Sequence, residues 1–168
     1  MTQGDRDHDV VIEHPNREKA ASQATKAIVI GLLLISVVLL ILISIGGWEK
    51  TEGARWLQIV YVLLYLMIAF FIARWSRGVL PVASALAIIL LIFAAVAAPG
   101  WYSRDKPGFA STTIAPEFIG LLCVALIPVQ LLLIAFAMRG FGQAWNVEVE
   151  HPAGEHRSPP SGGAIAAV

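Results

Sequence analysis

Four polar side chains inside otherwise apolar stretches are the residues of this sequence best placed to do chemistry. Gln58, Tyr61 and Tyr65 are spaced i, i+3 and i+7, so they share one face of a helix. Gln130 lies in a later stretch, two residues after Pro128, which removes a backbone hydrogen bond and favours a kink. Because polar groups facing lipid are costly, these side chains should point inward. They would either line a polar cavity for a small ligand or bond helices to one another, and the pattern favours bonding.

Two segments of nearly the same sequence stand near the two ends of the chain. Residues 9–15 read Asp-Val-Val-Ile-Glu-His-Pro, and residues 146–152 read Asn-Val-Glu-Val-Glu-His-Pro. In both, apolar residues alternate with the period of a β-strand, and proline ends the segment. We therefore predict short strands at 9–13 and 146–150 that pair with each other. The residues expected to carry this pairing, or the docking of a partner, are Val10, Ile12, His14, Val147, Val149 and His151.

The same segments contain carboxylate and imidazole groups, at Glu13 and His14 and again at Glu150 and His151. These groups suit a divalent transition metal. Their spacing is not that of an established metal motif, so we expect solvated tails and no bound metal. No histidine lies in the apolar stretches, which excludes a haem held there by two histidines. Cys123 is the single cysteine, which excludes an intramolecular disulfide or a Cys-x-x-Cys pair, and we expect no cofactor and no enzymatic activity.

The elements that must position these residues are four long apolar stretches without a charged residue inside them. Of the 168 residues 57% are hydrophobic and 14% are charged, too few charges for a soluble surface of this size. Each stretch approaches the roughly 20 residues that a helix needs to cross the hydrocarbon core. We predict an all-α membrane protein whose residues 17–139 form a four-helix transmembrane bundle. The helices are expected at about 17–46, 56–76, 79–98 and 116–139.

Proline and asparagine predict where several helices begin and end. Asn16, after His14 and Pro15, is expected to cap one continuous first helix, because its side chain can accept from exposed backbone N–H groups. Pro99, followed by glycine, is expected to end the third helix, and Pro116 to open the fourth. Asp, Glu, His, Lys and Arg are absent from the interiors of all four stretches, which argues against proton-coupled transport.

Charge predicts the orientation of the bundle. An even number of spans puts both tails on one side. The tails and the turn between the second and third spans carry eight of the twelve Lys and Arg residues, against four on the other side. By the positive-inside rule, we expect the N-terminal tail, 1–16, and the juxtamembrane segment, 140–152, in the cytoplasm of a bacterium, with the spans in its inner membrane.

Residues 153–168 are rich in Pro, Gly, Ser and Ala and are expected to be disordered. Five tryptophans lie at span ends, as is typical of interface anchors. They are Trp48, Trp56, Trp75, Trp101 and Trp145.

The exit from the last span, residues 138–150, reads Met-Arg-Gly-Phe-Gly-Gln-Ala-Trp-Asn-Val-Glu-Val-Glu. With this segment and its four-span layout, the whole chain resembles small uncharacterised four-span bacterial membrane proteins. The resemblance implies no activity.

The function expected from the residues is that of a non-enzymatic accessory or scaffold subunit of an inner-membrane complex. The alternative is a small-solute transporter, a channel component or a small-ligand-binding membrane protein that uses Gln58, Tyr61, Tyr65 and the segment from Pro128 to Gln130. Expected partners are the lipid bilayer and another membrane protein or a second copy of the chain. A net charge of zero argues against nucleic acid.

Overall fold

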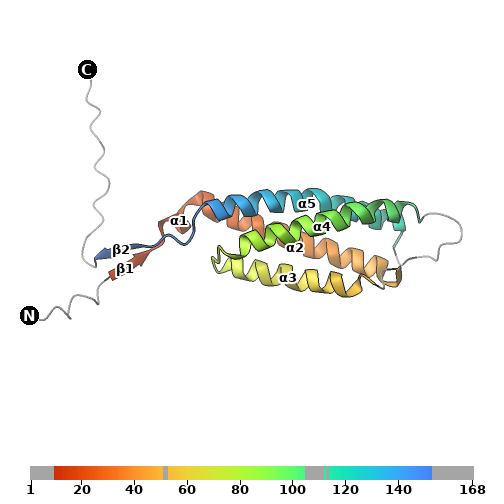
Figure 1. Ribbon diagram of the computed structural model, residues 1–168, viewed down its shortest axis with the longest axis horizontal. Helices are drawn as coiled ribbons and strands as arrows, with labels where there is room; N and C mark the ends of the chain where they lie inside the picture. The colour runs from red at the N-terminus through yellow and green to blue at the C-terminus, as the bar shows by residue number, and fades with distance from the viewer. Residues whose placement is uncertain (1–9, 51–52, 105–111, 113, 153–168) are drawn as a thin grey trace, which may run out of the picture.

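The long apolar stretches form a bundle of four helices, as predicted. The computed structural model describes residues 10–50, 53–104, 112 and 114–152. Four helices lie side by side along the long axis of the molecule (Figure 1). Each is long and apolar enough to cross a membrane. They are α2 (Ala20–Gly47), α3 (Arg55–Ala73), α4 (Val79–Tyr102) and α5 (Pro116–Gly142).

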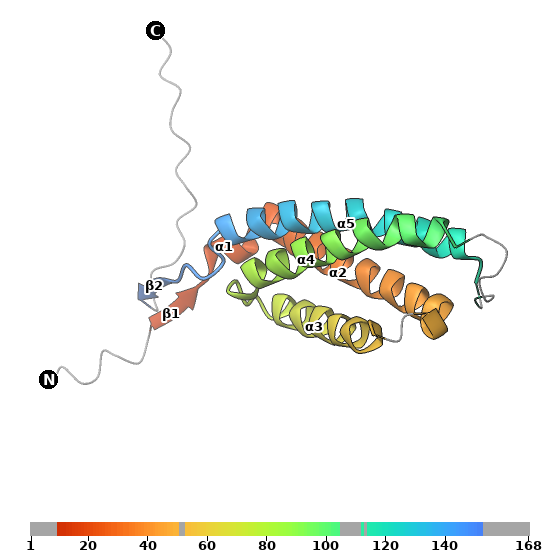
Figure 2. The ribbon, with the colours of Figure 1, turned by 45° about the vertical axis from the view of Figure 1, so that its right-hand side comes forward.

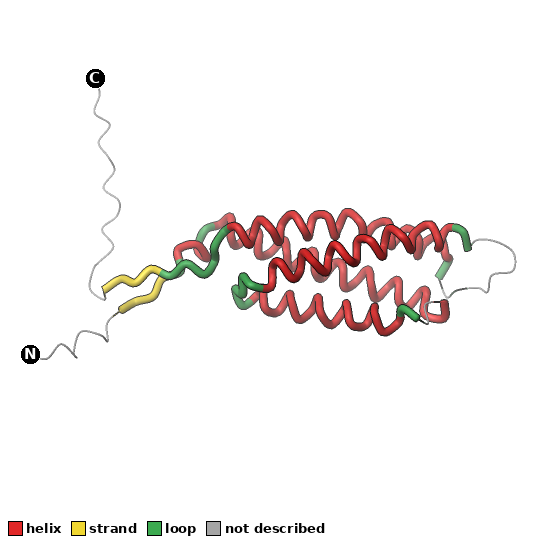
Figure 3. The backbone as a smooth tube through the Cα atoms, in the orientation of Figure 1, coloured by secondary structure: helices red, strands yellow, loops and turns green. Residues whose placement is uncertain are grey.

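A two-stranded sheet projects from one end of the bundle, beyond the short helix α1 (Pro15–Glu18) (Figures 1 and 3). Strand β1 (Val10–Glu13) runs antiparallel to strand β2 (Val149–Pro152). We call this end of the bundle the tail end. The opposite end, where α4 ends and α5 begins, is the loop end. The pairing of the two tails, predicted from their matched sequences, is therefore confirmed.

The bounds predicted for the second strand, 146–150, are wrong. In the observed register Ile12 lies opposite Glu150, and Glu13 lies opposite Val149. Val147 precedes the strand and is exposed. The shift arises because α5 continues three residues past its predicted end at 139, and the next residues pack against the bundle before the chain leaves it. The predicted disordered tail, 153–168, and the side chain of His151 lie outside the described residues.

The prediction of one continuous first helix is also wrong. Lys19 has an extended backbone, with ψ of 128°, and separates α1 from α2. Helix α1 begins at Pro15, which suits a first helical position because its missing N–H would have no helical partner. Asn16 does not cap the helix. Its Nδ2 donates instead to the carbonyl oxygen of Ala144, at 3.0 Å, so a contact with the distant end of the chain replaces the cap.

Helix α4 continues past Pro99 to Tyr102, four residues beyond the predicted end. The carbonyl oxygen of Pro99 still accepts from the backbone nitrogen of Ser103, at 3.1 Å. The continuation places Trp101 in the core, beside Gly120 of α5. A β-carbon at Gly120 would lie 3.3 Å from Cβ of Trp101, so the two helices approach closely here. Burial of this large aromatic side chain thus outweighs the helix-breaking tendency of proline.

Helices α4 and α5 make the most extensive contact in the bundle. The face that α4 buries contains Ala83, Ala87, Ala94 and Ala98. Small side chains at this spacing let two helix backbones approach closely, which is how helices associate in lipid without a hydrophobic driving force. Helix α3 contacts α4 much less extensively.

Candidate functional site

A chain of hydrogen bonds crosses the middle of the bundle. The Tyr65 hydroxyl donates to Oε1 of Gln130, at 2.8 Å. Nε2 of Gln130 donates to the hydroxyl of Ser36, at 2.8 Å, and that hydroxyl donates to the carbonyl oxygen of Leu32, also at 2.8 Å. All three polar side chains are completely buried. Because the groups are bonded to one another, the chain ties α2, α3 and α5 together, and it is the interhelical bonding that the sequence pattern favoured.

The other two residues of the polar face lie nearer the loop end and have separate contacts. Oε1 of Gln58 accepts from the hydroxyl of Ser44, at 3.0 Å. The Tyr61 hydroxyl lies 3.4 Å from the carbonyl oxygen of Leu86, and its ring packs edge-on against that of Tyr65. The four predicted residues therefore do not converge on one polar cavity. Tyr65 and Gln130 belong to the buried chain of hydrogen bonds. Gln58 and Tyr61 border a different cavity that is mainly apolar.

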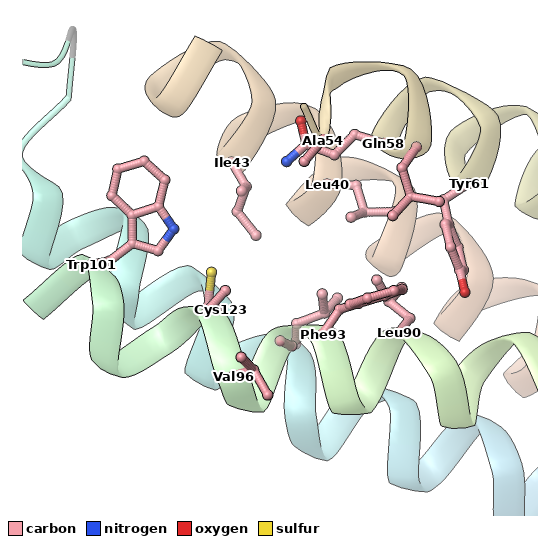
Figure 4. Close-up of a pocket in the computed structure, with 14 residues that line it drawn as sticks. Leu40, Ile43, Ala54, Gln58, Tyr61, Leu90, Phe93, Val96, Trp101 and Cys123 are labelled. Carbon is pink, nitrogen blue, oxygen red and sulfur yellow. The ribbon is translucent and has the colours of Figure 1, made fainter. Parts of the chain in front are cut away.

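This loop-end cavity has a volume of about 300 Å³ and lies among all four long helices. Leu40 and Ile43 of α2 form one wall, and Phe93 and Cys123 come from α4 and α5 (Figure 4). Trp101 lines the side nearest the end of the bundle. Gln58 and Tyr61, named from the sequence as possible cavity residues, border it, but its mainly apolar lining arises where α3 and α4 separate and not from a motif.

At the tail end two tryptophans pack against each other. Trp145 is completely buried, and its ring meets that of Trp75 edge-on at a centroid distance of 5.3 Å. Nε1 of Trp145 donates to Oε1 of Gln143 at 3.0 Å, and Nε2 of Gln143 donates to the hydroxyl of Thr25 at 3.0 Å. The ammonium group of Lys26 lies 4.0 Å from the centroid of the Trp75 ring, a cation–π contact. Interface anchoring, expected from the sequence, is thus not the whole role of these tryptophans.

Trp75 itself and Ala144, which precedes Trp145, adopt the left-handed backbone that favours glycine. Trp75 has φ of 64° and Ala144 has φ of 48°. Trp75 follows the end of α3, where Ser76 donates its backbone N–H to the Phe71 carbonyl and Trp75 donates to that of Ile72, the arrangement that commonly ends helices with glycine. This conformation costs a residue with a side chain roughly 1–2 kcal/mol. The packing of the tryptophans must exceed that cost.

Basic side chains bind the carbonyl groups that the helix ends leave without helical partners. Nζ of Lys26 donates to the carbonyl oxygen of Ala73 in the last turn of α3, at 2.7 Å. Nε of Arg77 donates to that of Phe141 in the last turn of α5, also at 2.7 Å. Helix C-termini carry partial negative charge, so both contacts are electrostatically favourable. The sequence did not indicate these contacts, because they join residues 47 and 64 positions apart and no local capping signal contains them.

Basic side chains also bind the residues that follow α5. Nε of Arg17 in α1 donates to the carbonyl oxygen of Trp145, at 3.0 Å, and Nη1 of Arg77 donates to Oδ1 of Asn146, at 2.9 Å. We call α1, the turn 74–78 and residues 143–146 the tail-end platform. The platform joins parts of the chain 128 residues apart and fixes where β1 ends and β2 begins.

Across the described ranges, histidine, cysteine and carboxylate side chains do not gather in any group of three that could hold a metal ion. His14 directly follows β1, and its Nδ1 is buried without a hydrogen-bond partner among the described residues. Comparison with protein families, with curated proteins and with solved structures found no match to this chain. Its function must therefore be argued from geometry.

Proposed function

We propose that this protein is a non-enzymatic accessory or scaffold subunit of a membrane complex. The bundle is the anchor, and the paired strands are a docking edge. The observation that carries this proposal is the tail-end platform, which ties the strand pair to the bundle through Asn16, Arg17 and Arg77. A two-stranded sheet alone is marginally stable in water. A sheet held at its base by a buried tryptophan is pre-organised, which lowers the cost of binding a partner.

The docking edge is the backbone of the strand pair. Within the described part of the chain, the sheet contains β1 and β2 alone, so each strand has an outer edge. Unpaired N–H and C=O groups on such edges accept an added strand. The partner proposed is therefore an extended segment of another protein.

Charge indicates what kind of segment would bind. Residues 10–13 and 146–150 contain three acidic residues, Glu13, Glu148 and Glu150, and no Lys or Arg. An acidic edge is complementary to a basic segment and would speed its association. The platform beneath is basic, which suits contact with the anionic lipids of the cytoplasmic leaflet. We therefore place the tail end in the cytoplasm of a bacterium, with the bundle in its inner membrane.

The bundle interior supports an anchor better than a pathway for solutes. The buried polar groups of Tyr65, Gln130 and Ser36 are bonded to one another and to a helix carbonyl. No Asp, Glu, His, Lys or Arg lies inside the apolar stretches of the sequence. Pathways for ions or protons are usually built on such residues.

The docking edge can be tested with a designed peptide. The full-length protein in lipid nanodiscs would be titrated with a labelled eight-residue peptide of alternating Lys and Val. The control peptide carries Pro at a central Val. We expect the first peptide to bind roughly tenfold or more tightly, because proline removes a backbone donor and disrupts the added strand. Absence of binding, or equal binding of both peptides, would contradict strand addition.

Co-purification tests the scaffold role itself. The protein would be isolated from its native membrane in mild detergent, beside a variant carrying Glu148→Lys and Glu150→Lys. We expect a stoichiometric partner with the wild-type chain and its loss from the variant, since the reversed charges repel a basic segment. A wild-type chain that purifies alone would contradict the proposal. So would a partner that the variant retains in full.

A further inference from the structure

The loop-end cavity continues into a second hollow at the end of the bundle. This hollow has a volume of about 320 Å³ and shares four lining residues with the cavity, which are Ala54, Val96, Ala97 and Trp101. Its remaining walls include the side chains of Lys50 and Arg104. One continuous surface therefore has an apolar part inside the bundle and a basic part at its end.

The apolar part has the length and the access that an acyl chain needs. Along α4 its lining extends from Leu90 to Trp101, about 16 Å at roughly 1.5 Å per residue. That is about half of a hydrocarbon core roughly 30 Å thick, the depth of one leaflet. Phe93 and Val96 stand at its lipid-facing side, where Val96 is 73% exposed (Figure 4). A chain could enter sideways from the bilayer without crossing water.

The basic part lies where lipid phosphate groups would be. Arg104 follows the end of α4, and its guanidinium carbon lies 4.5 Å from the Trp101 ring centroid. Neither Lys50 nor Arg104 donates a side-chain hydrogen bond to another described residue, unlike Arg55 nearby, whose Nε donates to the Trp48 carbonyl at 2.7 Å. Two cations at this level suit the phosphodiester of an anionic lipid.

One polar donor faces the cavity itself. In Figure 4 the indole nitrogen of Trp101 points toward the cavity interior. The hydrogen bonds among the described residues include none from this nitrogen, whereas the corresponding nitrogen of Trp145 donates to Gln143. Between a phosphate and an acyl chain a phospholipid carries an ester carbonyl, which accepts the kind of hydrogen bond that this group can donate.

We propose that the loop-end cavity binds one phospholipid, with an acyl chain along Leu90 to Trp101 and its phosphate against Lys50 and Arg104. The apolar wall, the donor of Trp101 and the two cations follow the order of chemical groups in such a lipid. The second acyl chain stays in the bilayer. This site is at the opposite end from the docking edge, so each proposal can fail without the other.

Native mass spectrometry of the full-length protein in detergent tests the site. The probes are dioleoyl-phosphatidylglycerol and dioleoylglycerol, which share their acyl chains and differ in the phosphate headgroup. We expect one molecule of the phospholipid to remain bound, roughly tenfold or more tightly than dioleoylglycerol. Inorganic phosphate should not compete, because it has no acyl chain. Equal retention of both lipids, or displacement by inorganic phosphate, would overturn the proposal.

Two sets of variants test where the phospholipid binds. Lys50→Ala with Arg104→Ala should weaken phospholipid binding roughly tenfold or more, and Arg55→Ala should leave it unchanged. Ala97→Leu fills the cavity and should abolish binding, whereas Ala95→Leu makes the same change on the exposed side of α4. Helix content measured by circular dichroism confirms that each variant is folded, and Ala54→Leu replaces Ala97→Leu if that variant unfolds. Unchanged binding in both cavity-filling and charge variants would overturn the assignment.

Discussion

The tail end and the loop end of this bundle use the same residue types and differ in what those residues contact. At the tail end Trp145 is buried against Trp75, and Lys26 binds a helix carbonyl. At the loop end Trp101 borders a cavity, and Arg104 stacks on it beside a hollow. Tryptophan and basic residues at a membrane interface can therefore close one end of a bundle and leave the other open. Their presence in a sequence does not distinguish the two outcomes.

The lengths of the connections explain the difference. At the tail end α3 and α4 are joined by residues 74–78, a turn too short to let the helices separate. Figure 2 shows α3 diverging from α4 with distance from that turn. At the loop end the connections are longer, covering residues 48–54 and 103–115, and they allow the separation. The cavity lies where the two helices are no longer held together.

The largest expected effect comes from removing the tryptophan that closes the tail end. Trp145→Ala should lower the free energy of unfolding by roughly 3–5 kcal/mol, because it leaves a cavity and removes the partner of Gln143. The measurement is denaturant unfolding in detergent micelles, followed by circular dichroism. Trp56→Ala is the matched change at the loop end, where the side chain is 76% exposed, and it should cost less than about 0.5 kcal/mol. Equal losses of unfolding free energy in the two variants would contradict the contrast between the tail end and the loop end.

A smaller loss is expected from overfilling the space next to Trp145. A β-carbon at Gly140 would lie 3.2 Å from the Trp145 ring and 3.3 Å from Leu80. A β-carbon at Gly142 would have no such neighbouring atom within 4 Å. Gly140→Val should therefore cost roughly 1–3 kcal/mol in the same unfolding experiment. Gly142→Val makes the identical change on the same helix and should cost clearly less. If the two variants unfold alike, the tail end is less tightly packed than described.

The smallest expected loss of stability tests how far the tightly bonded part of the bundle extends toward the loop end. Tyr65→Phe removes the donor to Oε1 of Gln130 in the buried chain and should cost about 1 kcal/mol. Tyr61→Phe removes a hydroxyl whose contact with Leu86 is long, at 3.4 Å, and should cost less. Thermal unfolding of the two variants side by side measures the difference. A greater loss for Tyr61→Phe would place the tightly bonded region nearer the loop end.

The features that the sequence predicted well are those set by local pattern. Four charge-free stretches predicted the bundle, and matched alternating segments predicted paired tails. The break at Lys19 and the shift of β2 depend on contacts such as that of Asn16 with Ala144, between residues 128 positions apart. A local pattern cannot contain them. The continuation of α4 past Pro99 likewise follows from the burial of Trp101, which is a property of the packed bundle.

The candidate site also combines features set by local sequence with features set by the packing of distant residues. The bonding of Tyr65 and Gln130 between helices follows from their polarity inside apolar stretches, so the sequence pattern alone favours it. The left-handed backbone of Trp75 and Ala144 was not predicted, because neither residue type favours it. It becomes understandable only once the two tryptophan rings are seen to pack together. The loop-end cavity depends on the divergence of two helices and has no sequence motif.

The pairing of the two tails, on which the scaffold proposal rests, is tested most directly by disulfide formation between them. In a Cys123→Ala background, Glu13→Cys would be combined with Val149→Cys, which lies directly opposite it. Opposed residues of antiparallel strands are close enough for a disulfide after small adjustment. A second protein would combine Glu13→Cys with Val147→Cys. Peptide mapping by mass spectrometry after mild oxidation in membranes should find the first disulfide in most chains and the second in few. Absence of the first disulfide, or equal yields of both, would contradict the account.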